Sequence, residues 1–163
     1  MGKYDPKPTN TGGDFTDDEF NGAGLPSSSR GGFFGEGAHK VELQRLKRIV
    51  SKNPRTLGEI KYVIECVVLE STSEPPGSRR AQIVRKEGYN ALEHLRQFFE
   101  FGAIPANAPE IDGVEPAWSV AYFDAAFGGD GAALEGLILG LDTEIVPTKS
   151  GGQFTIHTWR TAA

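Results

Sequence analysis

The sequence predicts a mostly β fold with one or two helices, and three observations support this class. Five strand-length stretches rich in β-branched and aromatic residues occur along the chain. One segment with helical spacing lies between the third and the fourth stretch. Many of the 21 glycines fall in the leader and in turns between the stretches. Three strands, a helix and two further strands are the element order of a five-stranded OB-like barrel.

The chain divides into a flexible N-terminal leader, 1–32, and an OB-like β-barrel domain, 33–163. The leader is rich in Gly, Pro, Ser, Thr, Asn and Asp, so it cannot bury enough apolar surface to offset the entropy of ordering. Within it, residues 15–20 (FTDDEF) place three acidic side chains between two phenylalanines. This segment is read mainly as a solvated linker, and alternatively as a docking motif for a basic partner surface.

The first three strands are predicted before residue 88. Residues 39–50 alternate apolar and polar side chains and slip by one near Arg45, as a β-bulge would cause. A helix through the same segment is the alternative, but the glycines before it provide no cap. Residues 60–70 are the clearest strand, and Cys66 within it is expected to be a buried spectator. After a Pro-Gly turn, residues 79–86 form a more polar third strand.

The second half of the domain is predicted to contain the helices and a hairpin. Asn90 is a plausible N-cap for a helix whose apolar face consists of core side chains. A second short helix is expected over 118–127. Residues 137–146 and 153–159 pair as a hairpin across a Lys-Ser-Gly-Gly turn. The apolar face of the first helix is made by Leu92, Leu95, Phe98 and Phe99.

Motifs for catalysis or metal binding are not found in the sequence. There is no phosphate-binding loop, and the histidines His39, His94 and His157 are too far apart in the sequence to form a local zinc motif. The loop carboxylates are most simply solvated charges, because no nucleophile or acid pair stands out. We therefore expect no enzymatic activity, no catalytic residues, no cofactor and no metal site.

Targeting features are equally sparse. No run approaches the roughly 20 apolar residues of a membrane span, and the N-terminus lacks the apolar core of a signal peptide. A single cysteine excludes an internal disulfide. These observations predict a protein of the reducing cytoplasm with no membrane partner.

Charge is distributed unevenly along the chain. The net charge is −5, but residues 33–100 carry 12 basic and nine acidic side chains, whereas residues 101–163 carry two basic and eight acidic. An anionic partner would therefore meet the middle of the chain. The overall acidity argues against a protein that coats duplex DNA by charge alone.

Cationic and aromatic residues supply the candidate site. One cationic cluster lies at the end of the first strand and in the next loop, and another lies on the third strand. In an OB-like barrel both border one groove, to which the last loop adds a lysine. A single-strand binder needs cations for phosphates and aromatic rings for base stacking. Tyr62, Phe154 and Trp159 are the candidate stackers, each with a core role as the alternative. The predicted nucleic-acid-binding residues are Lys47, Arg48, Lys52, Arg55, Tyr62, Arg79, Arg80, Arg85, Lys86, Lys149 and Trp159.

The chain resembles the phage-encoded single-stranded-DNA-binding proteins with an OB-like fold. The resemblance rests on the approach Phe34-Gly35-Glu36-Gly37, on the strand at 62–72 with its following turn, strand and helix, and on the closing segment 149–159. It implies a non-enzymatic, sequence-tolerant binder of single-stranded DNA in phage DNA replication or recombination, located in the host cytoplasm. The chain departs from this family at its end, where familiar members carry an acidic tail and this chain ends in Arg160-Thr161-Ala162-Ala163.

The sequence leaves several choices open. The leading hypothesis is single-stranded DNA binding, and the sequence does not separate DNA from RNA. Phage or host replication proteins are candidate partners of the leader, and homo-oligomerisation is left undecided. The alternative is a structural or assembly protein of virion type, whose β-domain self-associates and whose N-terminal arm orders on assembly.

Overall fold

The computed structural model describes residues 32–88 and 90–162, so the predicted leader lies outside the described residues except for Gly32. Six strands, two α-helices, a 3₁₀ turn and a π-helical turn make up this part of the chain. In chain order they are β1 (Gly32–Phe33), β2 (Gly37–Val50), the 3₁₀ turn (Pro54–Thr56), β3 (Ile60–Ser71), β4 (Arg79–Arg85), α2 (Ala91–Phe98), the π-helical turn (Phe99–Ala103), α3 (Val120–Phe127), β5 (Ile138–Pro147) and β6 (Gln153–Thr161).

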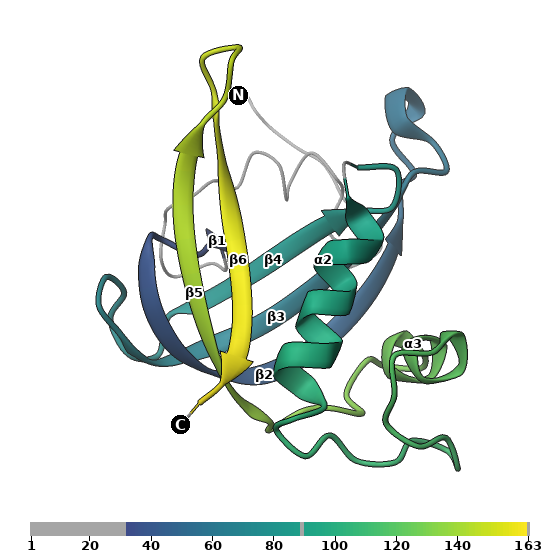
Figure 1. Ribbon diagram of the computed structural model, residues 1–163. Coiled ribbons are helices and arrows are strands. Elements are labelled where there is room, and N and C mark those ends of the chain that lie inside the picture. The colour runs from purple at the N-terminus through teal and green to yellow at the C-terminus, as the bar shows by residue number, and fades with distance from the viewer. Residues whose placement is uncertain (1–31, 89, 163) are drawn as a thin grey trace, which may run out of the picture.

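The strands form one sheet in the order β1-β4-β3-β2-β5-β6 (Figure 1). The five long strands pair antiparallel, and the two-residue β1 adds a parallel edge beside β4. The helix α2 stands between the third and the fourth long strand in the sequence. The predicted mostly β, OB-like element order is therefore confirmed, with β1 as an addition that the sequence did not suggest.

The two ends of the long-strand sheet, β4 and β6, approach each other, and no backbone ladder joins them among the described residues. Helix α2 and the π-helical turn pack against β6, and α2 also touches β4 (Figure 1). Trp159 Nε1 donates to Gln82 Oε1 at 2.8 Å, which joins side chains of β6 and β4. The sheet is thus curved around a core that a helix covers at this seam.

Alternation along the strands separates an inner from an outer side of the sheet. On β3, Tyr62, Ile64, Cys66 and Val68 all point into the hydrophobic core. Burial of Cys66 is as predicted, and it raises the pKa of the thiol. The predicted bulge is present in β2, where the pairing register shifts between Leu43 and Arg45. The bulge keeps the apolar side chains of both halves of this long strand on the core side.

Two details of the helices differ from the prediction. Asn90 precedes α2 in a left-handed conformation, φ 55°, and its side chain makes no capping hydrogen bond. Leu92, expected on the apolar face, is 69% exposed, whereas Leu95, Phe98 and Phe99 are in the core. The buried face of α2 consists of Ala91, Leu95 and Phe98 and continues into the π-helical turn at Phe99, so Leu92 lies beside this face rather than on it.

Helix α3 lies within the predicted segment 118–127 and begins at Val120, two residues later than predicted. The Ser119 side chain accepts a hydrogen bond from the Tyr122 amide at 3.2 Å, which satisfies an N-terminal donor. The Tyr122 hydroxyl donates to the Pro109 carbonyl at 2.6 Å and anchors the irregular segment before the helix. None of the helices in the described part of the chain is long and apolar enough to cross a membrane.

Candidate nucleic-acid interface

The outer face of β2, β3 and β4 carries a mixture of cations and apolar side chains. Cross-strand register places these residues on one face, opposite the core-facing Tyr62 and Ile64. Phe33 of β1 aligns with Ala81 and joins the same face, because its neighbour Phe34 is in the core. We call this surface the outer face; it consists of Phe33, Glu42, Arg45, Lys47, Ile49, Lys61, Val63, Glu65, Val67, Arg79, Ala81, Ile83 and Arg85.

Carboxylates of the described residues pair with Arg45, Lys47 and Arg85 of the outer face. Lys47 Nζ lies 3.1 Å from the carboxylate of Glu65, its neighbour on β3. Arg85 Nη2 lies 2.6 Å from Glu59 at the start of β3. Arg45 Nη1 lies 3.1 Å from Glu135 in the segment before β5. These pairs hold the cations in place at the surface, although each also reduces the local positive potential.

A second group of cations, the loop-end cluster, lies where β2, β3 and β4 meet the β2–β3 loop. The Lys86 amide donates to the Ile60 carbonyl at 2.8 Å, which brings the end of β4 beside the start of β3. All members are exposed, and none has an ion-pair partner within residues 32–88 and 90–162. The cluster consists of Arg48, Lys52, Arg55 and Lys86.

Local hydrogen bonds shape the loop that presents this cluster. Ser51 is 3% exposed, and its hydroxyl lies 2.6 Å from the Thr56 hydroxyl while accepting from the Asn53 amide at 3.2 Å. Asn53 Oδ1 accepts from the Arg55 amide at 2.9 Å and caps the 3₁₀ turn. Short polar side chains bonding to nearby backbone amides favour such turns. The loop therefore holds its two cations outward on a defined backbone.

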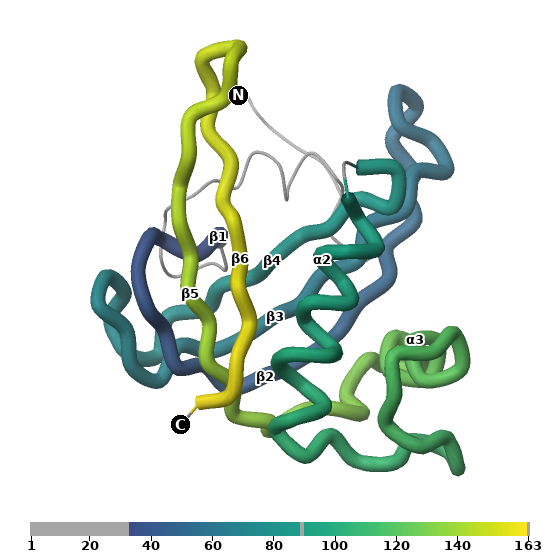
Figure 2. Tube along the Cα trace, viewed as in Figure 1, coloured from purple at the N-terminus to yellow at the C-terminus, as the bar shows by residue number. Residues whose placement is uncertain are grey.

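Lys149 lies on the tip of the β5–β6 hairpin. Thr148 closes the tip: its amide donates to the Gly152 carbonyl at 2.9 Å, and its hydroxyl accepts from the Gly152 amide at 3.0 Å. Gly151 has φ +90°, which a side chain would strain. Figure 2 shows the hairpin tip and the β2–β3 loop projecting from the same end of the molecule. The sequence predicted that these two loops border one groove. In the structure they lie at the same end of the molecule, and nothing further brings them together.

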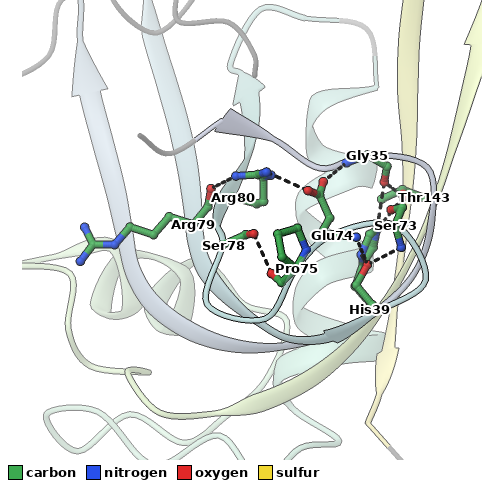
Figure 3. Close-up of polar contacts among 10 residues, drawn as sticks. Gly35, His39, Ser73, Glu74, Pro75, Ser78, Arg79, Arg80 and Thr143 are labelled. Atoms are coloured by element: carbon green, nitrogen blue, oxygen red, sulfur yellow. Dashed lines mark hydrogen bonds and ion pairs between the residues drawn. The ribbon is translucent and has the colours of Figure 1, made fainter. Parts of the chain in front are cut away.

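Arg80 is not part of this surface, which corrects its assignment as a nucleic-acid-binding residue. Its guanidinium Nη2 lies 2.7 Å from Glu74 Oε1, and the two side chains are only 8% and 9% exposed. Figure 3 shows the pair enclosed by the β3–β4 turn and the segment that contains Gly35, with Arg79 extending away. The sequence placed both arginines on one strand, but strand alternation turns Arg80 inward.

The buried pair belongs to a polar network, also drawn in Figure 3. Glu74 Oε2 accepts from the Gly35 amide at 2.6 Å. His39 Nε2 lies 2.9 Å from the Gly35 carbonyl, so this nitrogen carries the proton, and Nδ1 accepts from the Ser71 hydroxyl at 2.8 Å. Thr143 on β5 also bonds to the Gly35 carbonyl. The network ties the aromatic-glycine approach to β2 onto the β3–β4 turn and β5.

Burial sets the ionisation of this network. It lowers the pKa of His39, which favours the neutral ring that the hydrogen bonds require. It raises the pKa of Glu74, but hydrogen bonds from Arg80 and the Gly35 amide outweigh it, and the pKa ends below its usual value. The network therefore holds a neutral imidazole beside a charged ion pair whose polar atoms are hydrogen-bonded. This is typical of a structural role.

Tyr62 and Trp159 are also misassigned as base-stacking residues, because both rings are in the core. Tyr62 packs edge-on against Phe123 and Phe127 of α3, with ring centroids 5.1 and 5.0 Å away. Trp159 is 1% exposed, packs 5.0 Å from Phe98 and bonds to Gln82. Their core roles were the alternative drawn from the sequence, and nucleic-acid bases have no access to either ring.

Three other aromatic rings are exposed among the described residues, and one of them, Phe101 in the π-helical turn, is 58% exposed. Phe154 on β6 is 51% exposed, and Phe33 on the outer face is 37% exposed. Phe33 was missed because β1 has only two residues and shows no strand pattern. The Phe33-Phe34 pair was its signal, since adjacent residues of a strand face opposite sides. Lys61 and Arg45 were missed because only the register places them on the outer face, Lys61 beside Arg85 and Arg45 beside Glu65.

No group of three His, Cys, Asp or Glu side chains within residues 32–88 and 90–162 is placed to hold a metal ion. A scan against protein-family models found no match, and a search of curated proteins found no similar sequence. The candidate interface therefore rests on the geometry of the chain itself.

Proposed function

We propose that this protein binds single-stranded DNA in a sequence-tolerant way, through the outer face and the loop-end cluster. The observation that carries the proposal is the loop-end cluster, four exposed cations free of carboxylate partners within the described residues, at the end of the cation-bearing outer face. Such cations attract phosphates and release counterions when they bind. Nothing in this arrangement requires a base of particular identity.

The dimensions of the outer face suit a single strand. Arg79 and Arg85 lie at opposite ends of β4, and six residues of strand span about 20 Å. Apolar side chains of Ala81 and Ile83 lie between them on the same face. A row of cations of this length, with apolar side chains between them, supports binding of several nucleotides. This agrees with the site size of ~4–16 nucleotides for one OB-like domain.

Base stacking in this proposal falls to exposed rings rather than to the buried ones. Phe33 lies on the outer face next to β4, where a base unstacked from its neighbours can contact it. Stacking on an aromatic ring contributes roughly 1–3 kcal/mol per base and tolerates any base. The biological setting that we propose follows the resemblance of the sequence: DNA replication or recombination of a phage in the host cytoplasm, without catalysis.

The test is fluorescence anisotropy with labelled oligo-dT, a duplex of equal length and an RNA oligomer, over a salt series. We expect binding to oligo-dT that weakens as salt rises, with duplex bound much more weakly. The variant Lys52→Ala/Arg55→Ala should flatten the salt dependence by a slope of about 1.4, or about 0.7 for each lost phosphate contact on a single strand. The duplex arm separates a strand-tracking groove from general attraction to charge.

The matched control is Arg96→Ala/Arg160→Ala, which removes two cations from α2 and β6, outside the outer face and the loop-end cluster. Both variants change the net charge equally, so equal losses of affinity would contradict this placement. No binding of oligo-dT at low salt would overturn the function itself. Particles or closed oligomers formed without nucleic acid would then favour the assembly role.

A further inference from the structure

The β5–β6 hairpin extends beyond the rest of the sheet as a two-stranded ribbon. β2 pairs with β5 only as far as Thr143, whereas β5 and β6 stay paired out to Pro147 and Gln153. Figure 1 shows the ribbon continuing past the other strands to its tip. A two-stranded hairpin alone is only marginally stable in water, so this ribbon would be stabilised by a further strand.

Side chains close the edges of the ribbon at two places. The Gln97 side chain closes the edge of β6 at Trp159, where its Oε1 accepts from the backbone amide at 2.6 Å and its Nε2 donates to the backbone carbonyl at 3.1 Å. On the opposite edge, Glu36 Oε2 accepts from the Ile145 amide at 3.1 Å. These backbone groups are therefore satisfied within the chain.

One stretch of the β6 edge has no such closure. Backbone groups alternate in direction along a strand, and those of Trp159 point away from β5. The amides of Gln153, Thr155 and His157 therefore point to the same edge. None of the three donates to a group outside the ribbon within residues 32–88 and 90–162. We call these three positions the open edge.

The open edge lacks the features that keep edge strands from pairing with another chain. Natural edge strands are protected by lysines, prolines or bulges. Between Lys149 and Arg160 there is no Asp, Glu, Lys, Arg or Pro, and the β5–β6 register runs without a shift. Burial lowers the pKa of His157 to about 4, so its ring is neutral at pH 7. The open edge can therefore accept another strand.

We propose that two copies of the chain pair antiparallel through their open edges, with a two-fold axis at Thr155. In this register Thr155 lies opposite Thr155 of the second copy, and Gln153 of each copy lies opposite His157 of the other. Each of these pairs exchanges two backbone hydrogen bonds. Both open edges are then occupied, so the assembly is complete with two copies.

The side chains of the ribbon match a second copy in this register. Phe154 and Ile156 lie on the side of the ribbon away from the core, and Phe154 is 51% exposed. With Thr155 on the axis, Phe154 of each copy lies directly opposite Ile156 of the other. Such aromatic and β-branched pairs stabilise adjacent strands. The facing segments carry no charge, so two identical strands meet without repulsion.

Sedimentation velocity of the full-length chain, over a dilution series without nucleic acid, tests the dimer independently of the proposed function. The open edge spans only about 15 Å of strand, so we expect a dimer at micromolar concentrations that dissociates on dilution. Monomer at every concentration would overturn the proposal. Assemblies that grow beyond two copies would also overturn it, because an isologous contact closes at two.

Thr155→Pro tests the edge itself. It removes the central amide of the open edge, and an edge strand tolerates proline where the amide faces solvent. We expect the dissociation constant of the dimer to rise about tenfold or more. Thr155→Val keeps the amide and the β-branched side chain, so it should dimerise like the unchanged protein. A dimer that Thr155→Pro leaves intact would place the interface elsewhere and overturn the proposal.

A pair of charge variants tests the register, and it remains informative if Thr155→Pro does not fold. Phe154→Glu and Ile156→Lys each place a charge against an apolar side chain, so each alone should weaken the dimer about tenfold. In an equal mixture the introduced carboxylate faces the introduced ammonium. The mixed dimer should therefore be several-fold stronger than either variant alone. A mixture no stronger than the separate variants would overturn the register.

The matched control is Phe101→Glu and Val120→Lys, which change exposed apolar side chains of the π-helical turn and α3 in the same way. Both should dimerise like the unchanged protein, alone and mixed. Losses equal to those of the ribbon variants would show that the effect is not specific to the open edge and would overturn the proposal.

Hydrogen exchange at the Thr155 and His157 amides separates a second copy from a segment of the same chain as the occupant. Protection of both amides should rise with protein concentration, in parallel with the dimer seen by sedimentation. Protection that is already complete in the dilute monomer would overturn the proposal in favour of a segment of the same chain.

Discussion

Arg79 and Arg80 are adjacent on β4 but lie in opposite environments, one exposed and one buried. Arg80 points inward, where its side chain is 8% exposed and bonded to Glu74. Arg79, one residue earlier, is exposed and has no carboxylate partner within the part of the chain that the structure describes. The guanidinium of Arg80 therefore joins two loops on the inner side of the sheet. The guanidinium of Arg79, on the outer side, is available to a ligand.

This difference follows from solvation. A buried charge loses its hydration and must recover the loss from a partner, so Arg80 is committed to Glu74. An exposed charge keeps its water and can exchange it for a phosphate at little cost. Changing Arg79 and Arg80 together would confuse a loss of stability with a loss of binding. The two residues have to be tested separately, and the inner side should give the larger effects on stability.

The largest effect is expected for Arg80→Met. It leaves the Glu74 carboxylate buried without its guanidinium, and breaking such a pair costs about 3–5 kcal/mol in the free energy of unfolding. Urea denaturation measures this loss. The double variant Glu74→Met/Arg80→Met should recover part of it, because no uncompensated charge remains. A loss below about 1 kcal/mol for Arg80→Met would mean that the pair is solvated.

The next effect concerns His157, whose ring also faces the inner side of the sheet. Burial lowers its pKa to about 4, the nearby His94 contributes in the same direction, and Nε2 has no hydrogen-bond partner among the described residues. Between pH 6.5 and 4 the unfolded chain binds a proton that the folded chain does not, so stability falls as the pH falls. The loss approaches about 3 kcal/mol for this shift.

Urea denaturation at pH 7.5 and at pH 4.5 checks this expectation against His157→Phe, which keeps an aromatic ring beside Phe34 and cannot be protonated. The variant should lose less stability on acidification than the unchanged protein. His39 and Glu74 leave a residual loss, because the pKa of each is also lowered in the fold. Equal losses in both proteins would show that His157 is not the group responsible.

The sequence predicts the strands well because their signal is local. Alternating or continuous β-branched residues mark β2 and β3, and a Gly-Gly turn marks the β5–β6 hairpin. The bulge in β2 was visible as a slip in alternation. Helix α2 was placed correctly, but Leu92 was assigned to its buried face because the large apolar side chains drew the stripe through Leu92, whereas the buried face passes through the small Ala91.

The candidate site was predicted less well, because it depends on pairing between distant segments. Arg79 and Arg85 were placed on the correct strand, whereas Arg80 was counted with them without regard to its side of the sheet. Tyr62 could be assigned to the core only once α3 was known to pack over it. Lys61 gave no signal, since its position beside Arg85 is a property of the register alone.

A smaller effect is expected on the outer side, for Arg79→Ala. Stability should change by less than about 0.5 kcal/mol, as for most surface substitutions. Affinity for oligo-dT should fall about threefold to tenfold, and the salt slope by about 0.7, if Arg79 contacts one phosphate. Arg96→Ala on α2 is the matched control and should leave both quantities unchanged. Arg79→Ala binding that equals the unchanged protein at every salt concentration would remove β4 from the interface.

The smallest effect should come from breaking the ion pair of Arg85 with Glu59, and it is an effect on the free energy of unfolding. This exposed pair is the direct comparison for the buried pair of Arg80 with Glu74. Its 2.6 Å separation is as short as that of the buried pair, but the Arg85 side chain is 60% exposed. Water competes for the guanidinium, so Arg85→Met should cost only about 0.2–1 kcal/mol, and less as salt screens the charges. Urea denaturation at low and high salt measures this difference. A loss as large as that of Arg80→Met, unchanged by salt, would show that Arg85 is withdrawn from water in solution. Burial, rather than the distance between the charged atoms, would still decide the energy.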